Sequence, residues 1–232
     1  MRPEHPIVLI TGASAGFGEA TARLLAERGC HLILGARRLE RVEALARELA
    51  EKHGVRTFAG RVDTRDTASV EAFVKAGAGA LGGLHVVVAN AGLASGLHKI
   101  WEIPDADMEA MLRTNVEGVV KTIRAALPFV RQSGWGHVFF LGSTAGHQAY
   151  EGGGVYSASK HGIKALAHTL RHQLEALIYP GFAHATPWPQ WPRLPIYLQA
   201  MQKRMEKYSH NPARDQAREA DVQALLAMWQ EK

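Results

Sequence analysis

At Thr11-Gly12-Ala13-Ser14-Ala15-Gly16-Phe17-Gly18 the chain turns from an apolar run, 7–11, into a segment of helical spacing, 16–28. Small residues in such a turn let the backbone approach a pyrophosphate, and the helix start offers free N–H groups and a positive dipole end. The glycine spacing is G-x-x-x-G-x-G, so the general dinucleotide fingerprint, G-x-G-x-x-G, is met only approximately. A plain glycine turn is the alternative. The strand–turn–helix context favours a cofactor site formed by Gly12, Ser14, Gly16, Phe17 and Gly18.

Strand and helix patterns alternate outward from this loop. Further strand-like runs occupy 31–36, 55–60, 84–90 and 136–142. Helical patterns occupy 39–52, 66–81, 105–131 and 155–177, and glycines at 77–83 are expected to fray one helix end. Such alternation predicts right-handed β-α-β units and a parallel sheet covered on both faces. We therefore expect an α/β fold with a Rossmann-like doubly wound sheet, in three α/β/α layers, as a single domain over 1–232.

The composition excludes several classes of protein. The 232 residues are 47% hydrophobic and 21% charged, which is typical of a globular chain. The longest apolar runs are a few residues, far short of the about 20 that a transmembrane helix needs, and no secretory signal is evident. A single cysteine, Cys30, excludes an internal disulfide and fits a reducing cytosol. We expect a cytoplasmic protein that does not associate with membranes, with Cys30 as a small buried residue.

The charge pattern argues against nucleic acid as a partner. The chain has 27 basic and 22 acidic residues, and the arginines alternate with glutamates, as over 37–43. Alternation of this kind is typical of a solvated helix face. No basic cluster with aromatic platforms is evident. His168 and His172 are one helical turn apart, but no nearby acid or cysteine completes a ligand set, so they are expected to face solvent and no metal site is expected.

The end of the second predicted strand indicates which dinucleotide would bind. An acidic residue there commonly holds the ribose hydroxyl of NAD, whereas an arginine suits the extra phosphate of NADP. Here Arg37 and Arg38 stand at the strand end and no acid is present. A guanidinium matches a phosphate dianion better than a neutral hydroxyl. NADP is therefore favoured; the alternative is that both arginines only solvate the next helix.

Tyr156 and Lys160 are spaced i,i+4 and lie on one face of a predicted helix. Free tyrosine has a pKa near 10, and a nearby ammonium favours the phenolate. Ser143 ends the preceding predicted strand, where its hydroxyl could hold a substrate oxygen while Tyr156 exchanges the proton. A surface Tyr-x-x-x-Lys pair also arises by chance. The strand-end serine and the glycine loop together remove most of that alternative.

In these motifs the chain resembles the short-chain dehydrogenase/reductase family. The matching motifs, in the family's order over about 6–175, are the Thr11–Gly18 loop, Val62-Asp63, Ala89-Asn90-Ala91-Gly92, Asn115, Ser143 and Tyr156-x-x-x-Lys160. The resemblance implies that Asp63 and Thr64 lie at the adenine end and that Asn90 packs the core beside the cofactor. It also implies that Asn115 kinks its helix, so that a water links its carbonyl to Lys160, and that Lys160 holds the nicotinamide ribose.

A narrower resemblance concerns the segments 16–19, 90–94, 142–146 and 150–156. They are similar to the NADP-dependent 3-hydroxy acid branch of the family, the serine or allo-threonine dehydrogenases. This implies small polar hydroxy acids as candidate substrates, with Ser143, Tyr150 and Tyr156 as substrate contacts. Relatives with the same motifs take other alcohols and ketones, so the substrate stays open.

The last quarter, 176–232, departs from the family pattern. Pro180-Gly181 follows the Tyr–Lys helix earlier than in the family, although the spacing to Thr186 is kept, which implies cofactor contacts by Pro180, Gly181 and Thr186. The family's seventh strand has no counterpart, so we expect a sheet that is incomplete at its C-terminal edge. The family pattern also implies a homo-oligomer, a dimer or a tetramer.

The sequence thus predicts an oxidoreductase that uses NADP(H) and transfers a hydride between the nicotinamide and an alcohol or carbonyl substrate. The predicted catalytic residues are Asn115, Ser143, Tyr156 and Lys160. The alternative is an NADP-binding pseudoenzyme or regulatory module whose altered C-terminal region forms no complete substrate pocket.

Overall fold

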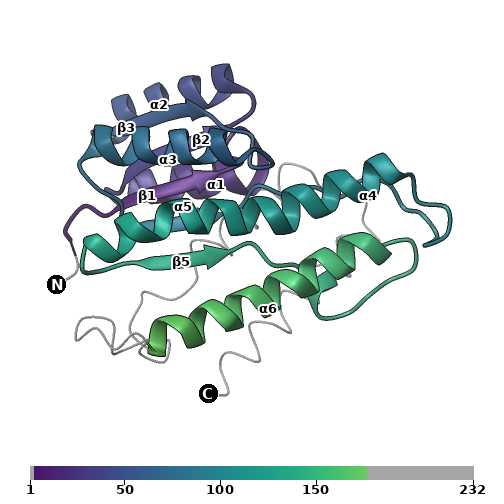
Figure 1. The fold of residues 1–232 in the computed structure, drawn as a ribbon. Coiled ribbons are helices and arrows are strands. Elements are labelled where there is room, and N and C mark those ends of the chain that lie inside the picture. Colours follow the sequence, from purple (N-terminus) through teal and green to yellow (C-terminus); the bar gives the residue numbers. More distant parts are fainter. Residues whose placement is uncertain (1–2, 177–232) are drawn as a thin grey trace, which may run out of the picture.

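The computed structural model describes residues 3–176, and within them a parallel sheet forms the centre of the fold (Figure 1). The strands are β1 (Ile7–Thr11), β2 (His31–Ala36), β3 (Thr57–Arg61), β4 (Val86–Ala89) and β5 (His137–Phe140). Among the described residues they are ordered β3-β2-β1-β4-β5. The order reverses between β1 and β4, as in a doubly wound sheet, and ligands of such sheets bind at that reversal. The predicted Rossmann-like fold is confirmed.

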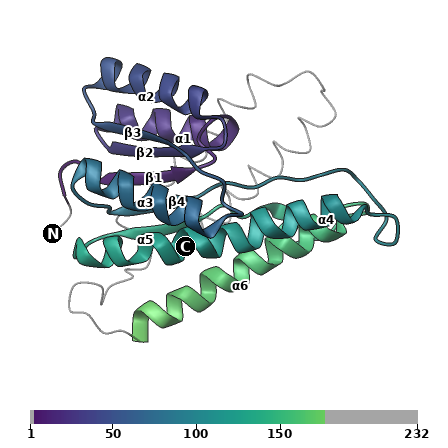
Figure 2. The same ribbon diagram turned by 45° about the horizontal axis from the view of Figure 1, so that its top comes forward.

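Helices cover both faces of the sheet (Figure 2). One face carries α1 (Gly16–Glu27) and α2 (Leu39–His53), and the other carries α3 (Thr67–Leu81) and α5 (Gly118–Gln132). The remaining helices, α4 (Asp105–Leu112) and α6 (Gly154–Ala176), lie on the α5 side. Alternate residues of a strand point to opposite faces, so a strand in this sheet must be apolar throughout.

Strand β2 shows this double burial most clearly. Leu32 and Leu34 pack with α1 and α2, whereas Ile33 packs with α3, and all three side chains are fully buried. Cys30, just before this strand, is buried in the same core as Leu32, as its small size predicts. The continuous apolar run in the sequence therefore reflects two cores that share one sheet.

The long helix predicted over 105–131 is divided in the structure. α4 leads into a π-helical turn, η1 (Arg113–Glu117), and α5 follows. The turn contains Asn115, where the family resemblance implies a kink. A π turn adds a residue to the helical repeat and frees backbone groups, and such turns are frequent at functional sites.

The prediction that glycines fray α3 is wrong. The helix continues to Leu81 and ends at Gly82, whose φ of +83° is the left-handed conformation of a helix C-terminus. A Cβ on Gly77 would overlap Cγ2 of Ile33 in β2. Gly77 is therefore small because α3 lies directly against the sheet there, a contact that the sequence pattern alone does not reveal.

Two histidines at the amino ends of strands accept backbone hydrogen bonds. The Ile7 N–H donates to Nδ1 of His85 at 3.0 Å, and the Arg56 N–H donates to Nδ1 of His31 at 3.1 Å. Burial lowers the pKa of His85, and burial together with the nearby charges of Arg56 and His5 lowers the pKa of His31. Both imidazoles must be neutral to accept these bonds.

Acid should therefore destabilise the fold through these imidazoles. Because their pKa is lower in the folded chain, the unfolded chain binds more protons, so the free energy of unfolding is highest above about pH 6.5 and falls as the pH drops below it. An asparagine in place of His85 would offer an amide oxygen that takes up no proton. We expect His85→Asn to lose less stability than the natural chain between about pH 7.5 and about 5.5, measured by urea unfolding. An unchanged pH dependence in His85→Asn would contradict this assignment.

Candidate active site

The glycine loop after β1 packs closely against the start of α1 and the end of β4. Gly12 has a φ of +70°, which favours glycine. A Cβ on Gly18 would lie 2.5 Å from the Gly12 carbonyl oxygen and 2.6 Å from Nδ2 of Asn90. Side chains at these positions would fill the space into which the loop folds. The glycines therefore permit the close backbone approach that a pyrophosphate site needs.

Asn90 ties the two central strands together at this end of the sheet. Its Nδ2 donates to the carbonyl oxygens of Thr11, at 2.7 Å, and Gly12, at 3.3 Å. In return, Oγ1 of Thr11 accepts the N–H groups of Asn90, at 3.2 Å, and Ala91, at 3.1 Å. Thr11 and Asn90 are both buried, so these bonds fix the loop at the point where the strand order reverses.

The start of α1 is open to an anion. Its N-cap residue, Ala15, has no side chain that could cap the first N–H groups. Free N–H groups and the positive end of the helix dipole favour a phosphate at this position. Close by, Nη2 of Arg38 donates to Oγ of Ser14 at 3.0 Å, and the Arg38 side chain is exposed. The structure thus brings an arginine from the end of β2 to the loop that follows β1.

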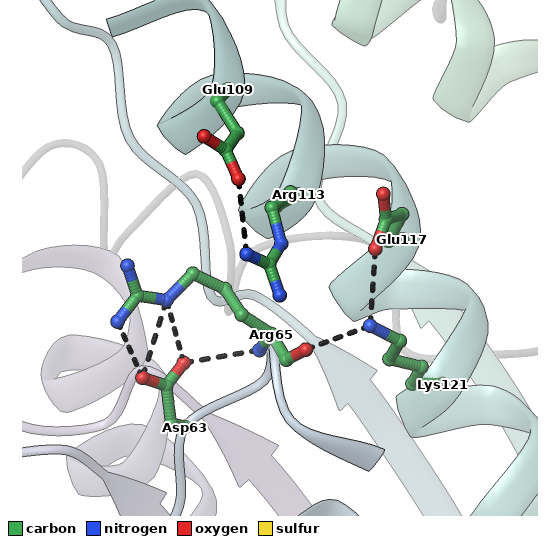
Figure 3. A network of polar contacts seen from close by, with 6 residues as sticks. All are labelled: Asp63, Arg65, Glu109, Arg113, Glu117 and Lys121. Carbon is green, nitrogen blue, oxygen red and sulfur yellow. Dashed lines mark hydrogen bonds and ion pairs between the residues drawn. The ribbon is translucent and has the colours of Figure 1, made fainter. Parts of the chain in front are cut away.

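Asp63, which follows β3, is held by a residue that the sequence analysis missed. Arg65 donates Nη2 to Oδ2 of Asp63 at 2.6 Å and Nε to Oδ1 at 2.9 Å (Figure 3). Hydrogen bonds from the Arg65 side chain and backbone, with the charges of Arg65 and Arg37, lower the pKa of Asp63 to about 2. A carboxylate has about four acceptor sites, so this pairing leaves Asp63 room for another donor. The spacing of an acid and an arginine two residues apart was the available signal.

The same region is tied to α5. Nζ of Lys121 donates to the Arg65 carbonyl oxygen at 2.7 Å and pairs with Glu117 at 3.1 Å (Figure 3). Thr64 is buried, and a Cβ on Gly118 would lie 2.8 Å from its Oγ1. The turn after β3 therefore packs against the start of α5, and Thr64 has a structural contact in addition to its predicted role at the cofactor.

Asn115 joins the π turn to the segment after β4 and to α6. Its Oδ1 accepts the Leu93 N–H at 2.8 Å, and its Nδ2 donates to the Leu93 carbonyl at 2.8 Å and to Oγ of Ser159 at 3.1 Å. Ser159 in turn donates to the Tyr156 carbonyl oxygen at 2.7 Å. Asn115 is almost completely buried, so the π turn and the first turns of α6 are held by one hydrogen-bonded chain. No motif or spacing in the sequence marks Ser159.

Tyr156 and Lys160 lie together on α6. Nζ of Lys160 is 5.8 Å from the centre of the Tyr156 ring and donates to the Leu141 carbonyl oxygen at 2.8 Å. Burial lowers the pKa of Lys160. Tyr156 is half-buried. The predicted i,i+4 contact is therefore present, beside the chain that leaves β5.

Ser143 begins a short 3-10 turn, η2 (Thr144–Gly146), that packs on α6. Its Oγ accepts the Ala145 N–H at 3.2 Å. A Cβ on Gly146 would lie only 2.7 Å from the Lys160 carbonyl oxygen, so η2 and α6 are in direct contact. The hydroxyl hydrogen of Ser143 is not used in this bond and is available to an acceptor.

A hollow lies beside Tyr156. It is lined by Ser95, Gly96, His98, Ile100, Ile103, Met111 and residues 152–156. Among the predicted substrate contacts, Tyr156 lines this hollow, whereas Ser143 and Tyr150 do not. The half-exposed Tyr150 instead covers Gly153, where a Cβ would overlap its ring. His98 and Ser95 were not singled out from the sequence, because no motif spacing marks them.

Several predictions concern other parts of the chain. Pro180, Gly181 and Thr186 lie outside the described residues. Within 3–176, no group of His, Cys, Asp and Glu side chains is arranged to hold a metal, and His168 is exposed. No helix of that part is both long and apolar enough to span a membrane.

Comparison with known proteins defines the class. The short chain dehydrogenase family matches residues 6–185. The chain belongs to this family and is an oxidoreductase that acts on CH–OH groups.

Individual relatives show which branch of the family the chain is similar to. The chain is 39% identical over 186 residues to the NADP-dependent 3-hydroxy acid dehydrogenase YdfG of Salmonella typhi, covering 78% of this chain and 73% of the relative. It is 39% identical over 184 residues to sulfoacetaldehyde reductase 2 of Chromohalobacter salexigens, covering 76% and 72%. Among solved structures, an alcohol dehydrogenase of the archaeon Thermococcus sibiricus, complexed with 5-hydroxy-NADP, superposes with a TM-score of 0.71 at 36% identity, covering 73% and 72%. The predicted resemblance to the 3-hydroxy acid branch is confirmed.

Proposed function

We propose that this chain is an NADP(H)-dependent dehydrogenase for small anionic 3-hydroxy acids. The observation that carries the proposal is a convergence at the carboxyl edge of the sheet. There the loop of Gly12 and Gly18, the Arg38–Ser14 pair and the Tyr156–Lys160 pair come from separate elements. Its relatives include enzymes named for NADP and for 3-hydroxy acids.

The residues present fit NADP. The glycine loop and the uncapped start of α1 would hold the pyrophosphate, and Ser14, Arg37 and Arg38 would hold the additional phosphate. Asp63 and Thr64 would lie at the adenine end, Asn90 beneath the cofactor, and Lys160 at the nicotinamide ribose. When bound, the cofactor supplies or accepts the hydride.

Tyr156 is the proposed general acid and base. Its phenol gives a proton to the carbonyl oxygen during reduction, and its phenolate takes a proton from the hydroxyl during oxidation. The Lys160 ammonium lies near the ring, where its charge would stabilise the negative charge that develops on the phenol oxygen during proton transfer. Ser143 would donate its hydroxyl hydrogen to the substrate oxygen, because its Oγ already accepts the Ala145 N–H.

Asn115 is proposed to position the proton path. A Cβ on Gly92 would lie 3.2 Å from Oδ1 of Asn115 and 3.7 Å from Nζ of Lys160, so the two polar groups border the same small space. This supports a relay that passes from Tyr156 through Lys160 toward Asn115. The bonds of Asn115 to Leu93 and Ser159 would hold this arrangement during turnover.

The anionic substrate class is supported by the relatives' names. A 3-hydroxy acid carries a carboxylate and sulfoacetaldehyde carries a sulfonate, so both present an anion close to the reacting carbon. The homo-oligomer and the cytoplasmic location stay predictions.

The proposal is tested by turnover. With the full chain, we expect 3-hydroxybutyrate, serine or allo-threonine to reduce NADP, which is measured by the absorbance of the NADPH formed. We expect NAD to be a much poorer hydride acceptor. A chain that binds NADPH but turns over no hydroxy acid, alcohol or ketone would instead support the pseudoenzyme alternative. Turnover that prefers NAD would contradict the role of Arg37 and Arg38.

A further inference from the structure

We propose that His98 is a specificity-determining residue that binds the carboxylate of the substrate, and that Asp107 is the positioning residue that holds its imidazole. This inference rests on the proposed function. Among the described residues, the lining of the hollow includes Tyr156 and His98 and no acidic side chain. The imidazole of His98 is therefore the side chain of that lining that could hold an anion beside the tyrosine.

The imidazole is fixed by its neighbours. Nε2 of His98 lies 3.3 Å from Oδ2 of Asp107, in the first turn of α4, and the His98 side chain is 30% exposed. A Cβ on Gly96 would overlap the ring, so only glycine admits the imidazole at this position. Gly96 has a φ of +65°, which also favours glycine. The Nε2 edge of the ring therefore lies against both Gly96 and Asp107.

Asp107 holds a second residue of the lining. Its Oδ1 accepts the hydroxyl of Ser95 at 2.6 Å while Oδ2 faces His98. One carboxylate behind the hollow thus fixes two polar side chains that border it. Asp107 is not among the residues that line the hollow, so its carboxylate contacts the imidazole from outside the lining.

The backbone of His98 connects its side of the hollow to the segment that carries Tyr156. The His98 N–H donates to the Gly152 carbonyl oxygen at 3.1 Å, and His98 pairs with Gly153 as a parallel bridge. The Gly153 carbonyl accepts the Ser157 N–H at 2.7 Å, next to Tyr156. The position of the imidazole is thereby tied to the helix turn that carries the phenol.

The two ring nitrogens then have different tasks. Nε2 faces Asp107, so Nδ1 is left for a ligand, and among the described residues it has no hydrogen-bond partner. A charged imidazole would donate from both nitrogens, one to Asp107 and one to a carboxylate. A substrate held in this way keeps its carbinol end for Tyr156.

The test compares racemic 3-hydroxybutyrate with 3-hydroxybutanamide, which has the same shape without the charge. We expect His98→Gln to raise KM for the acid about 10- to 100-fold, with little change for the amide or in kcat. His98→Lys should recover part of the loss, because it restores a cation. Asp107→Asn should raise KM for the acid in the same selective way, since its amide can still accept the Ser95 hydroxyl.

The matched control is Lys99→Gln. Lys99 is the next residue, and its cation pairs with Glu102 at 3.5 Å and lies over Trp101, outside the lining of the hollow. Lys99→Gln should leave KM for the acid and KM for the amide unchanged. If Lys99→Gln raised KM for the acid as much as His98→Gln does, any nearby cation would attract the substrate anion, and the proposal would be overturned. An equal rise in KM for the acid and for the amide in His98→Gln would also overturn it.

Binding gives a readout that does not depend on turnover. Calorimetry of 3-hydroxybutyrate with the NADPH-saturated chain, in which the hydroxy acid has no hydride acceptor, should show binding that His98→Gln weakens by the same factor, while unfolding midpoints report whether each variant is folded. One outcome is that the amide is turned over and that the natural chain and His98→Gln bind the acid equally well. This outcome overturns the role of His98 and leaves the dehydrogenase assignment intact. Absence of all turnover, with acid binding still dependent on His98, rejects the proposed reaction and supports the site.

Discussion

Replacing Tyr156 by phenylalanine is expected to lower kcat about 10²- to 10⁴-fold, the range for loss of a general acid or base. The phenyl ring keeps the shape of the side chain and its place beside Lys160, and only the proton-transfer oxygen is lost. Among the described residues that line the hollow, His98 is the only other one with a titratable side chain, and its Nε2 faces Asp107, so no neighbour there replaces the phenol oxygen readily. Steady-state oxidation of the best hydroxy acid found, with NADP, measures the effect.

The control for this variant is cofactor binding. Tyr156→Phe should keep the rise in unfolding temperature that NADPH gives the natural chain, since a ligand of the native state stabilises it by about 2.7 kcal/mol at 100 times its Kd. Ser157→Ala is the matched neighbour, because Oγ of Ser157 is buried without a hydrogen-bond partner among the described residues. It should retain turnover. Wild-type turnover by Tyr156→Phe would reject the mechanism.

Replacing Arg38 by alanine is expected to weaken NADPH binding about 10- to 100-fold and to leave NADH binding almost unchanged. A hydrogen bond to a charged group contributes about 1.5–3 kcal/mol, and 1.4 kcal/mol is tenfold in Kd. The Arg38 guanidinium already contacts Ser14 of the glycine loop, and it is exposed, so its removal leaves no buried group without a partner. Fluorescence titration with each nucleotide gives the two dissociation constants.

Arg41→Ala is the matched control for charge. Arg41 is an exposed arginine in the first turn of α2 and forms no hydrogen bond or ion pair with the loop among the described residues. Its loss should change NADPH and NADH binding equally and slightly. If Arg38→Ala weakens both nucleotides to the same degree, the arginine does not discriminate the extra phosphate, and the preference for NADP has another origin.

The sequence by itself determined the fold class, because the signals for it are local. Apolar runs such as that of β2, helical spacing and a glycine turn each act over a few residues, and their alternation leaves few topologies. The glycine loop, the Arg37–Arg38 pair and the Tyr156–Lys160 spacing could be read in the same way. The family resemblance then supplied residues such as Asn115, for which local pattern gives no reason.

Local pattern was wrong where a distant segment sets the requirement. Gly77 was expected to fray the end of its helix, yet it is the point where α3 touches Ile33. The helix over 105–131 is continuous in periodicity, but Asn115 binds Leu93 and Ser159 from inside a π turn. These features depend on which helices and strands pack against each other, and the spacing of hydrophobic residues along one segment carries no information about its packing partners.

Only the tertiary structure decided how the site is completed. It brought Lys121 to the Arg65 carbonyl, Arg38 to Ser14, and His98 to Asp107 and Tyr156. Hydrogen bonds and ion pairs act over about 3 Å, so they exist only after packing has fixed the elements that carry their donors and acceptors. The sequence therefore determined the scaffold and its reactive motif, and the packing of segments distant in sequence decided which side chains surround that motif.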